Sequence, residues 1–361
     1  MKITVVKKEF SDALKIMNKA CAVKPATPIL SGIYLKASSS CLELQATDYT
    51  LGIIAKIPAN VEVDGETVIV GKKLFKIVQK LSGEVVTIST QENLAEIFSG
   101  GSKFSLLIMS AEDFPKIQVE EAQEKMALKQ SQFKNLVSKT AFAASKDDSR
   151  PIFTGVLLKF EGEKLTFAAT NTHRLAVATE KISAQLNGEF IIPAKVLQEI
   201  TPMMNGEGEI TLIRSGSKIF FTFDNFLVTS RIIAGVYPNF EKLLNRENEI
   251  FATVDVEEFK NALDRVAVIA KETEYQTVNF LFANNELKIS ARSNEVGKAE
   301  ENISAEILGG EMDIGFNFGY WTDVLKVVDA DKITIGMSKP LAPVDFQAEN
   351  FHYVVTPVRR S

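Results

Sequence analysis

The chain has 361 residues, of which 45% are hydrophobic and 24% charged, and its formal net charge at pH 7 is −5. A chain of this length and composition is expected to fold as two or three globular domains. Its acidic balance argues against a protein that binds nucleic acid through an overall basic charge.

No run of about 18 apolar residues occurs, so no membrane-spanning helix is expected. The first residues are typical of a strand and lack the apolar segment of a signal peptide. The two cysteines, Cys21 and Cys41, are too few for a disulfide framework or a cysteine zinc site, and we expect both to be reduced. Together these features favour a cytoplasmic protein.

The first 115 residues are expected to hold two short helices among several strands. Apolar residues spaced by three and four positions predict the helices, and the prolines at 25 and 28 end the first one. The expected helices are residues 10–21 and 72–81. The expected strands are residues 3–6, 32–37, 41–45, 51–57, 66–70, 85–89, 94–98 and 103–109.

This order of elements then repeats at an offset of 123 residues. Ile29-Leu30-Ser31-Gly32 matches Ile152-Phe153-Thr154-Gly155, and Ala46-Thr47-Asp48 matches Ala169-Thr170-Asn171. The same offset links three further pairs of anchors: Phe10 with Phe133, Leu74 with Leu197, and Pro115 with Pro238. Five anchors at one spacing indicate a tandem repeat.

The second copy and a weaker third copy continue the pattern to the end of the sequence. The expected helices are residues 131–144, 194–203, 256–269 and 320–328. The expected strands are residues 155–160, 165–168, 209–214, 218–222, 227–233, 253–255, 277–282, 286–291, 298–303, 332–337, 344–347 and 352–355. Short helices among several strands imply antiparallel sheets with helices on one side. The sequence therefore predicts an α+β protein of three tandem domains with two helices each, over residues 1–121, 122–247 and 248–361.

The expected helices carry a net positive charge, so the strands and loops carry the negative charge. The helix over residues 72–81 has Lys72, Lys73, Lys76 and Lys80 and no acidic residue. Three of these lysines lie opposite the apolar stripe, which fits either a solvated helix face or a surface that attracts phosphates. Such phosphate contacts would carry no base-sequence information.

The sequence lacks the motifs of the common catalytic sites. It has no phosphate-binding loop, no G-x-G-x-x-G and no H-E-x-x-H, and two histidines cannot make a three-histidine zinc site. Neither an enzymatic activity nor a cofactor or metal is expected. His173 remains open between a structural residue at a strand end, a binding-surface residue beside Arg174 and a general base. His352 is expected to be structural.

The repeat, an Ala-Thr-x-x-His-Arg-Leu-Ala segment and a Tyr-Val-Val-x-Pro-x-Arg tail together resemble the bacterial DNA polymerase III β subunit family, the sliding clamps. The resemblance covers the whole chain. The residues that carry it are Thr170, His173, Arg174, Leu175, Ala176, Phe114, Pro115, Tyr237, Pro238, Lys24, Pro25, Pro28, Ile29, Leu30 and the tail from Tyr353 to Arg359.

The resemblance implies three clamp-like domains in a ring-forming, head-to-tail homodimer that is not an enzyme. Such a processivity factor encircles double-stranded DNA without sequence specificity and tethers the replicative DNA polymerase. The clamp loader and other proteins with clamp-binding motifs would share the same peptide-binding pocket. A closed ring of this kind is the result of a heterologous contact that closes.

The resemblance also assigns site residues. The peptide-binding pocket would comprise Phe153, Thr170, Thr172, His173, Arg174, Leu175, Pro238, Lys242, Leu243, Pro343, Val354, Val355, Thr356, Pro357 and Val358. The DNA-facing residues would be Lys15, Lys24, Lys72, Lys73, Lys76, Lys80, Lys134, Lys139, Arg150 and Lys195. The dimer interface would comprise Lys103, Phe104 and Leu106 facing Val268, Ile269, Glu300 and Glu301.

Three pocket positions depart from the family pattern. Thr172 stands where the family often has glycine, and Thr356 and Val358 stand where some members have methionine. Peptide preferences are therefore expected to differ from those of other clamps.

Outside the pocket, Asp147 lies in a loop where a neutral polar residue would suit DNA better.

Two other functions fit parts of the sequence. A hydrolase would use His173 as base and Arg174 to hold an anion, and loss of turnover in a His173→Ala variant would support it. A monomeric peptide-binding scaffold would be excluded by a solution mass near twice that of the 39.8 kDa chain.

Overall fold

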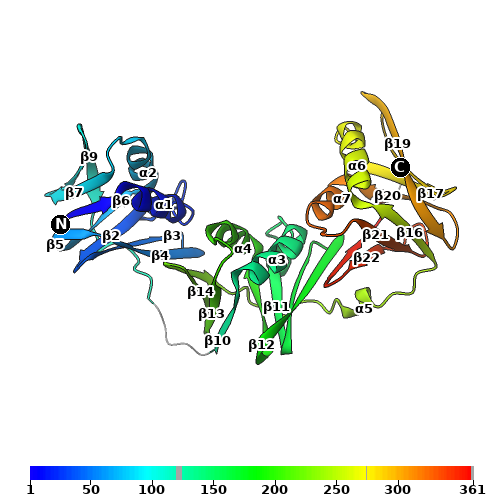
Figure 1. Ribbon diagram of the computed structural model, residues 1–361, viewed down its shortest axis with the longest axis horizontal. Coiled ribbons are helices and arrows are strands. Elements are labelled where there is room, and N and C mark those ends of the chain that lie inside the picture. Colours follow the sequence, from blue (N-terminus) through cyan, green and yellow to red (C-terminus); the bar gives the residue numbers. More distant parts are fainter. Residues whose placement is uncertain (119–123, 274, 359–361) are drawn as a thin grey trace. The chain divides into compact units, whose positions relative to one another are not determined.

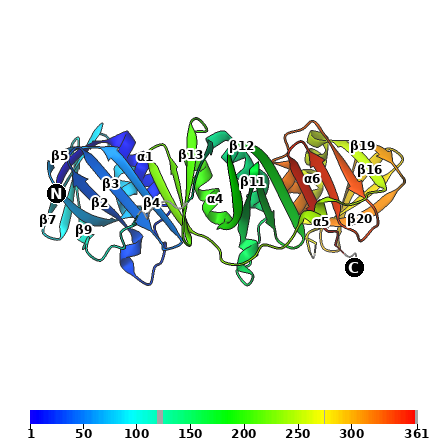
Figure 2. The same cartoon turned by 90° about the horizontal axis from the view of Figure 1, so that it is seen from below.

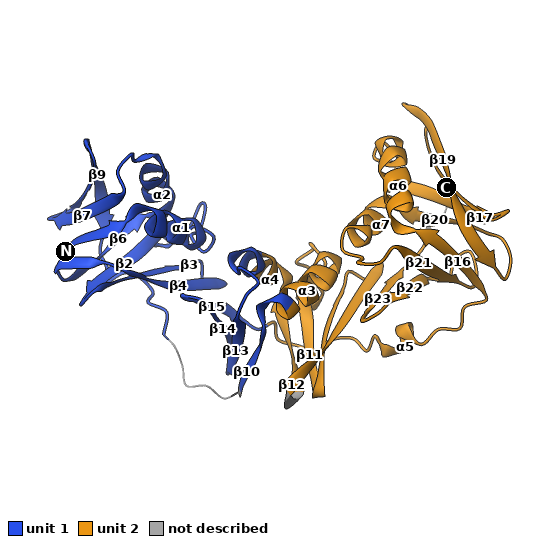
Figure 3. Ribbon diagram, in the orientation of Figure 1, with its two compact units in different colours: residues 1–131, 199–232 blue, residues 132–198, 233–361 orange. Residues whose placement is uncertain are grey.

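The computed structural model describes residues 1–118, 124–273 and 275–358, without the side chains of residues 124 and 184–187. The chain divides into two compact units, each with its own sheet (Figure 3). Unit 1 comprises residues 1–131 and 199–232, and unit 2 comprises residues 132–198 and 233–361.

Unit 1 contains a 13-stranded sheet in the order β10-β13-β14-β15-β4-β3-β2-β6-β9-β8-β7-β1-β5. Figure 2 shows β2, β3 and β4 side by side in this sheet. Its helices are α1 (Lys7–Met17), α2 (Gly71–Lys80) and the 3-10 helices η1 (Pro28–Ser31) and η4 (Thr201–Met203). Its strands are β1 (Lys2–Val6), β2 (Gly32–Ser38), β3 (Cys41–Thr47), β4 (Leu51–Pro58), β5 (Asn60–Val63), β6 (Gly65–Val70), β7 (Val85–Gln91), β8 (Leu94–Ser99), β9 (Ser102–Met109), β10 (Glu124–Lys129), β13 (Glu209–Ser215), β14 (Lys218–Phe223) and β15 (Phe226–Arg231).

Unit 2 contains a 10-stranded sheet in the order β11-β12-β23-β22-β21-β16-β19-β18-β17-β20. Figure 1 shows β16, β21 and β22 close together in this sheet. Its helices are α5 (Glu241–Leu244), α6 (Val256–Ala270), α7 (Phe318–Leu325) and the 3-10 helices η2 (Ala141–Ala143) and η3 (Pro151–Thr154). The limits between the units fall within α3 (Gln130–Thr140) and α4 (Ala194–Ile200). The strands are β11 (Gly155–Thr170), β12 (Arg174–Pro193), β16 (Ile250–Asp255), β17 (Thr277–Ala283), β18 (Glu286–Ser293), β19 (Gly297–Leu308), β20 (Met312–Asn317), β21 (Lys332–Met337), β22 (Val344–Ala348) and β23 (Phe351–Val355).

The α+β class is confirmed, and every ladder described in the two sheets is antiparallel. The expected helices occur as α1, α2, α3, α4, α6 and α7, in the expected order. The short elements α5, β5, β10 and β20 were not expected from the sequence.

The first helix was placed three residues too late at its start and four too late at its end. It begins at Lys7, whose backbone N–H donates to the Glu84 carbonyl at 2.8 Å, so the strand before it passes directly into the helix. It ends at Met17, because the Asn18 amide donates to the Leu14 carbonyl at 2.7 Å and to the Gly71 carbonyl at 3.3 Å. The bonds that involve Glu84 and Gly71 join segments far apart in the sequence, so the spacing of apolar residues within the helix does not reveal them.

The strands at the centre of the second copy are longer than expected. Residues 155–160 and 165–168 belong to one strand, β11, and β12 occupies residues 174–193, for which no strand was expected. The two strands pair with each other over nearly their whole length. Long-range pairing therefore extends both beyond their local propensity.

The lysines of α2 lie as their spacing predicts. Leu74 and Val78 are buried, whereas Lys73, Lys76 and Lys80 are exposed on the other side of the helix. No helix among the described residues is long and apolar enough to cross a membrane.

The same strand joint occurs once in each unit. In unit 1, residues 51–55 of β4 pair with residues 226–230 of β15. In unit 2, residues 174–178 of β12 pair with residues 351–355 of β23. The first members of these joints are separated by the repeat offset. Each joint therefore connects two successive copies, which is why the two compact units do not coincide with the three expected domains.

Candidate functional site

The turn between β11 and β12 is fixed by its own polar side chains. Asn171 Oδ1 accepts the backbone N–H of His173 at 3.1 Å and that of Arg174 at 3.0 Å. Thr170 Oγ1 accepts the Thr172 N–H at 3.1 Å and donates to the Arg174 carbonyl at 2.6 Å. Thr172 has a φ of +75°, in the left-handed region that favours glycine. This backbone conformation gives a physical reason for the glycine that the clamp family often has where this chain has Thr172.

The first copy contains the same turn between β3 and β4. Asp48 Oδ1 accepts the N–H groups of Thr50 at 2.9 Å and Leu51 at 2.8 Å. Thr47 Oγ1 accepts the Tyr49 N–H at 3.0 Å, and Tyr49 has a φ of +72°. The matched Thr-Asp and Thr-Asn pairs thus build one turn twice, because each short side chain bonds the same backbone groups.

The C-terminal tail is bonded to the second-copy turn. The Thr356 backbone N–H and Oγ1 donate to the His173 carbonyl at 2.8 and 3.0 Å. Further along, the Val358 N–H donates to the Gly315 carbonyl in β20 at 2.9 Å. The turn and the tail, which the sequence resemblance placed in one pocket, are therefore adjacent. The family-matched Arg359 lies outside the described residues.

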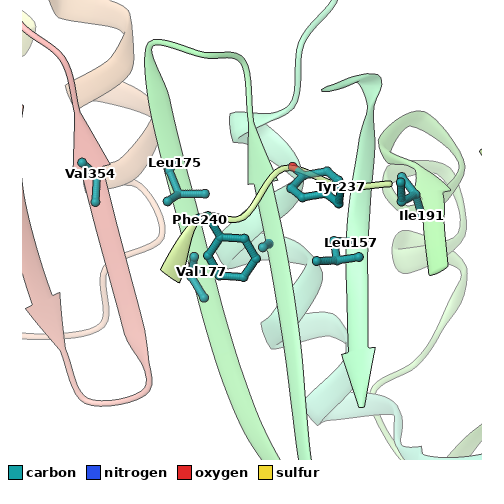
Figure 4. Close-up of a cluster of buried hydrophobic side chains, with 8 residues drawn as sticks. Leu157, Leu175, Val177, Ile191, Tyr237, Phe240 and Val354 are labelled. Carbon is teal, nitrogen blue, oxygen red and sulfur yellow. The ribbon is translucent and has the colours of Figure 1, made fainter. Parts of the chain in front are cut away.

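An apolar cluster, here called the docking cluster, lies beside this turn (Figure 4). Leu175 and Val354, both expected in the pocket, belong to it, and Leu244 of α5 packs against it. Lys242 and Leu243 lie on α5, which contacts β23. The cluster consists of Leu157, Ala168, Leu175, Val177, Ile191, Tyr237, Phe240 and Val354.

Six of these cluster residues were missed from the sequence. Tyr237 was noticed only through its Tyr-Pro match, and the others lack any local signal that distinguishes a pocket residue from a core residue. Burial raises the pKa of the Tyr237 hydroxyl, although the Thr170 backbone partly offsets this. The ring therefore remains neutral and contributes apolar surface.

A cavity of 540 Å³, lined mainly by polar and charged residues, lies against the same turn. Of the expected pocket residues, Phe153, Thr172, His173 and Arg174 line it, whereas Pro238, Pro343 and Pro357 do not. Its remaining lining residues are Ala144, Ser145, Lys146, Asp147, Arg150, Asn171, Gln276, Asn317, Gly319, Tyr320 and Asp323. Four expected pocket residues thus line the cavity and two, Leu175 and Val354, belong to the docking cluster, whereas the other expected pocket residues belong to neither set.

Arg174 and His173 have different surroundings. The Arg174 side chain is buried and forms an ion pair with Asp323 at 2.8 Å, a partner that the sequence did not reveal. The His173 side chain is exposed, and its ring lies parallel to the Tyr320 ring with centroids 6.4 Å apart. Among the described residues His173 has no carboxylate partner to orient it as a base, which does not favour a hydrolase. The described residues also contain no group of three His, Cys, Asp or Glu side chains placed to hold a metal ion.

His352 is part of a half-buried polar group. Its Nε2 lies 2.9 Å from Asp345 Oδ2, and the Asn248 amide donates to Asp345 Oδ1 at 2.9 Å. This group joins β22, β23 and the segment before β16, which is the structural role expected of His352.

Most of the expected DNA-facing cations are exposed, and Lys134 and Lys139 are half-buried. Asp147 lies beside Arg150 in the loop before η3, and its pKa is lowered by bonds from Ser149 and by the Arg150 charge. Asp147 thus remains ionised next to this arginine.

The charged residues expected at the dimer interface have partners within the chain. Lys103 lies 2.7 Å from Glu96, Glu301 is bonded to Arg265 at 2.8 Å, and Glu300 lies 3.1 Å from Lys288. The apolar candidates Phe104 and Val268 are exposed. Leu107, which was not expected there, is 70% exposed, whereas Leu106 is half-buried.

Family models match successive segments of the chain. They describe the N-terminal, central and C-terminal domains of the DNA polymerase III beta subunit and match residues 1–118, 127–239 and 241–359. Two relatives called beta sliding clamp, from Chlamydia pneumoniae and Staphylococcus aureus, are each 28% identical, and the alignments cover 99% of both chains.

Solved structures agree along the full length. A DNA polymerase sliding clamp from Bacillus subtilis superposes with a TM-score of 0.95 at 28% identity, covering 100% of both chains. A DNA polymerase III subunit beta sliding clamp from Pseudomonas aeruginosa, bound to griselimycin, superposes with a TM-score of 0.93 at 26% identity and the same coverage.

Proposed function

The chain belongs to the DNA polymerase III β subunit family of bacterial sliding clamps, and we propose that it closes around duplex DNA as a head-to-tail homodimer. It is a DNA polymerase processivity factor rather than an enzyme. Its three clamp domains are proposed to span residues 1–121, 122–247 and 248–361. The first of these boundaries lies outside the described residues.

The observation that carries ring closure is the repeated strand joint. Residues 51–55 and 174–178 each pair with a strand of the following copy. At the same offset, their third-copy counterparts are residues 297–301 of β19. These residues pair with β18 on one side, and no other described strand pairs with them.

The complementary half of such a joint is also present. Residues 226–230 of β15 have their first-copy counterparts in residues 103–107 of β9. These residues pair with β8 on one side, and no other described strand pairs with them. One protomer therefore offers both halves of a third joint, and two protomers arranged head to tail would complete two such joints.

The existing joints also give the register of the proposed one. Ala55 pairs with Phe226, and Leu51 pairs with Ser230. The same register would place Lys103 opposite Glu301 and Leu107 opposite Gly297. Opposite charges across an antiparallel pair contribute little each, so the exposed apolar side chains and the backbone bonds would supply most of the contact.

The DNA contacts would be few and non-specific. The exposed lysines of α2 and the other expected cations would face the duplex and attract its phosphates. The acidic remainder of the chain would limit this attraction. Enclosure by the ring, rather than a tight grip, would then keep the clamp on DNA while it slides.

Partner proteins would dock at the docking cluster and the turn beside it. Short peptides with a glutamine and two or three apolar residues suit a small apolar site with a few polar anchors. The replicative polymerase, the clamp loader and other proteins with such motifs are the proposed partners. Thr172, Thr356 and Val358 would make the site edge bulkier on one side and stiffer on the other. These partners would be met in the cytoplasm, where we propose that the chain acts.

The first experiment is the solution mass of the purified protein by light scattering. A mass near twice 39.8 kDa is expected, whereas a strictly monomeric solution would contradict the ring and favour the peptide-binding scaffold. Clamps loaded on circular plasmid should survive a high-salt gel filtration column and should be lost after the plasmid is cut. Loss from the intact circle at the same salt would refute enclosure.

A matched pair of variants tests the proposed joint. Leu107→Asp should produce monomers, because it places a charge in the apolar contact. Leu308→Asp is the control, because Leu308 is equally exposed at 71% but pairs with Phe251 outside the proposed joint. A dimeric Leu107→Asp protein would show that β9 is not the contact.

A further inference from the structure

The buried guanidinium of Arg174 is attached to two segments of unit 2 outside its own strand. Nη1 donates to Asp323 in α7 at 2.8 Å, and Nη2 donates to the Phe142 carbonyl in η2 at 2.5 Å. Arg174 Cζ also lies 4.8 Å from the Tyr320 ring centroid and 5.3 Å from the Phe142 ring centroid. A charge with only 7% of its residue surface exposed needs such partners to offset its lost hydration.

The backbone of the same residue belongs to the rim of the proposed docking site. Its N–H and carbonyl are bonded to Asn171 and Thr170 in the turn. The next residue, Leu175, is part of the docking cluster. The preceding carbonyl, of His173, accepts both bonds from Thr356 in the tail. A displacement of the Arg174 side chain would therefore move the turn, the cluster and the tail together.

The first copy shows that this turn does not need an arginine. Its turn makes the same three bonds to backbone N–H groups from Thr47 and Asp48, but the residue equivalent to Arg174 is Leu51, which is buried and apolar. Turn formation and filling of space thus do not explain Arg174. The ion pair with Asp323 provides something additional in the second copy.

We propose that the Arg174–Asp323 pair is a strut that sets the position of the docking-site rim against α7. Arg174 acts as a positioning residue, because both of its terminal nitrogens are bonded to other segments of unit 2, and only its Nε has no hydrogen-bond partner among the described residues. Asp323 becomes a determinant of peptide affinity although it lies outside the docking cluster. The inference rests on the proposed docking site.

The test compares Asp323→Asn with Asp329→Asn, the same change at an exposed aspartate just beyond α7. Binding of a fluorescein-labelled peptide with one glutamine and three apolar residues is measured by anisotropy on the full-length protein. Asp323→Asn should weaken binding about tenfold or more, because small misplacements of a site are costly, while Asp329→Asn should change nothing. Asp323→Glu, which keeps the charge, should restore part of the affinity.

A local measurement separates positioning from general loss of stability. Hydrogen exchange of the Thr356 amide should accelerate in Asp323→Asn, whereas amides in the centre of α6 should exchange at the unmodified rate. If Asp323→Asn does not fold, Asp323→Glu serves as the test. Weaker but measurable peptide binding by Asp323→Glu supports the strut, whereas the same affinity as the unmodified chain overturns it.

The outcomes are distinguishable. Unchanged peptide affinity and unchanged Thr356 exchange in a folded Asp323→Asn protein overturn the strut and leave the docking site standing. Failure of the unmodified chain to bind the peptide overturns the docking site itself, and the strut with it.

Discussion

Replacing Thr172 with glycine should stabilise unit 2. Thr172 holds a φ of +75°, and the left-handed region costs a residue with a side chain roughly 1–2 kcal/mol. Glycine avoids this cost but loses about 0.5–1 kcal/mol through its greater freedom when unfolded. The Thr172 side chain is exposed and makes no bond of its own, so little packing is lost. The net gain in the free energy of unfolding should be about 0.5–1 kcal/mol.

The chain is well suited to measuring this gain. Its single tryptophan, Trp321, is fully buried in unit 2, so indole fluorescence reports the unfolding of that unit. With a urea dependence of about 2–3 kcal/mol per molar, the midpoint should rise by roughly 0.2–0.5 M. Thr172→Ala keeps the β-carbon and should move the midpoint much less.

Tyr49→Gly is the matched change in unit 1. Tyr49 has a φ of +72° in the equivalent turn and is 56% exposed, so strain relief should again stabilise the surrounding unit. Far-ultraviolet circular dichroism reports both units, so the unfolding curve of the whole chain should move to higher urea. The midpoint of Trp321 fluorescence, which reports unit 2, should stay nearly unchanged. A fall in the midpoint for Thr172→Gly would refute the argument that its backbone conformation is strained.

Three further predictions concern a helix cap, a buried apolar side chain and the titration of a buried thiol. Asp255→Ala should lower the free energy of unfolding by about 1 kcal/mol in urea titrations, because Asp255 caps α6 by accepting the Glu258 N–H at 2.9 Å. Leu175→Ala should cost about 3–5 kcal/mol in the same measurement and should also weaken peptide binding, since Leu175 is buried in the docking cluster; an unaffected peptide affinity would argue against that site. Burial raises the Cys21 pKa from 9.0 to about 12, so the folded protein should react slowly with a thiol reagent at pH 9. Because the folded pKa is the higher one, this thiol's contribution to stability is present below pH 9 and lost as the pH rises towards 12.

Features that depend on neighbouring residues were predictable from the sequence. The lysine face of α2 and the paired turns at Asp48 and Asn171 follow from helical spacing and short polar side chains. The repeat offset of 123 residues could be recognised because the same short sequence patterns occur in successive copies. The resemblance to the clamp family then brought Leu175 and Val354 together correctly.

Features that depend on distant partners were not predictable. The full extent of β12 depends on its ladders with β11 and β23, and the end of α1 depends on a bond from Asn18 to Gly71. Asp323 is 149 residues from Arg174, and no local pattern marks it as the partner of a buried charge. Such contacts become visible only when the chain is folded.

The recurring ladder has a consequence for how a closed ring would be opened. In each protomer two of the three joints connect parts of one continuous chain, whereas the third would join separate polypeptides. A clamp loader would therefore need to separate only the strands paired between the two chains. Breaking these few backbone pairs would admit a duplex, and every other ladder could remain intact.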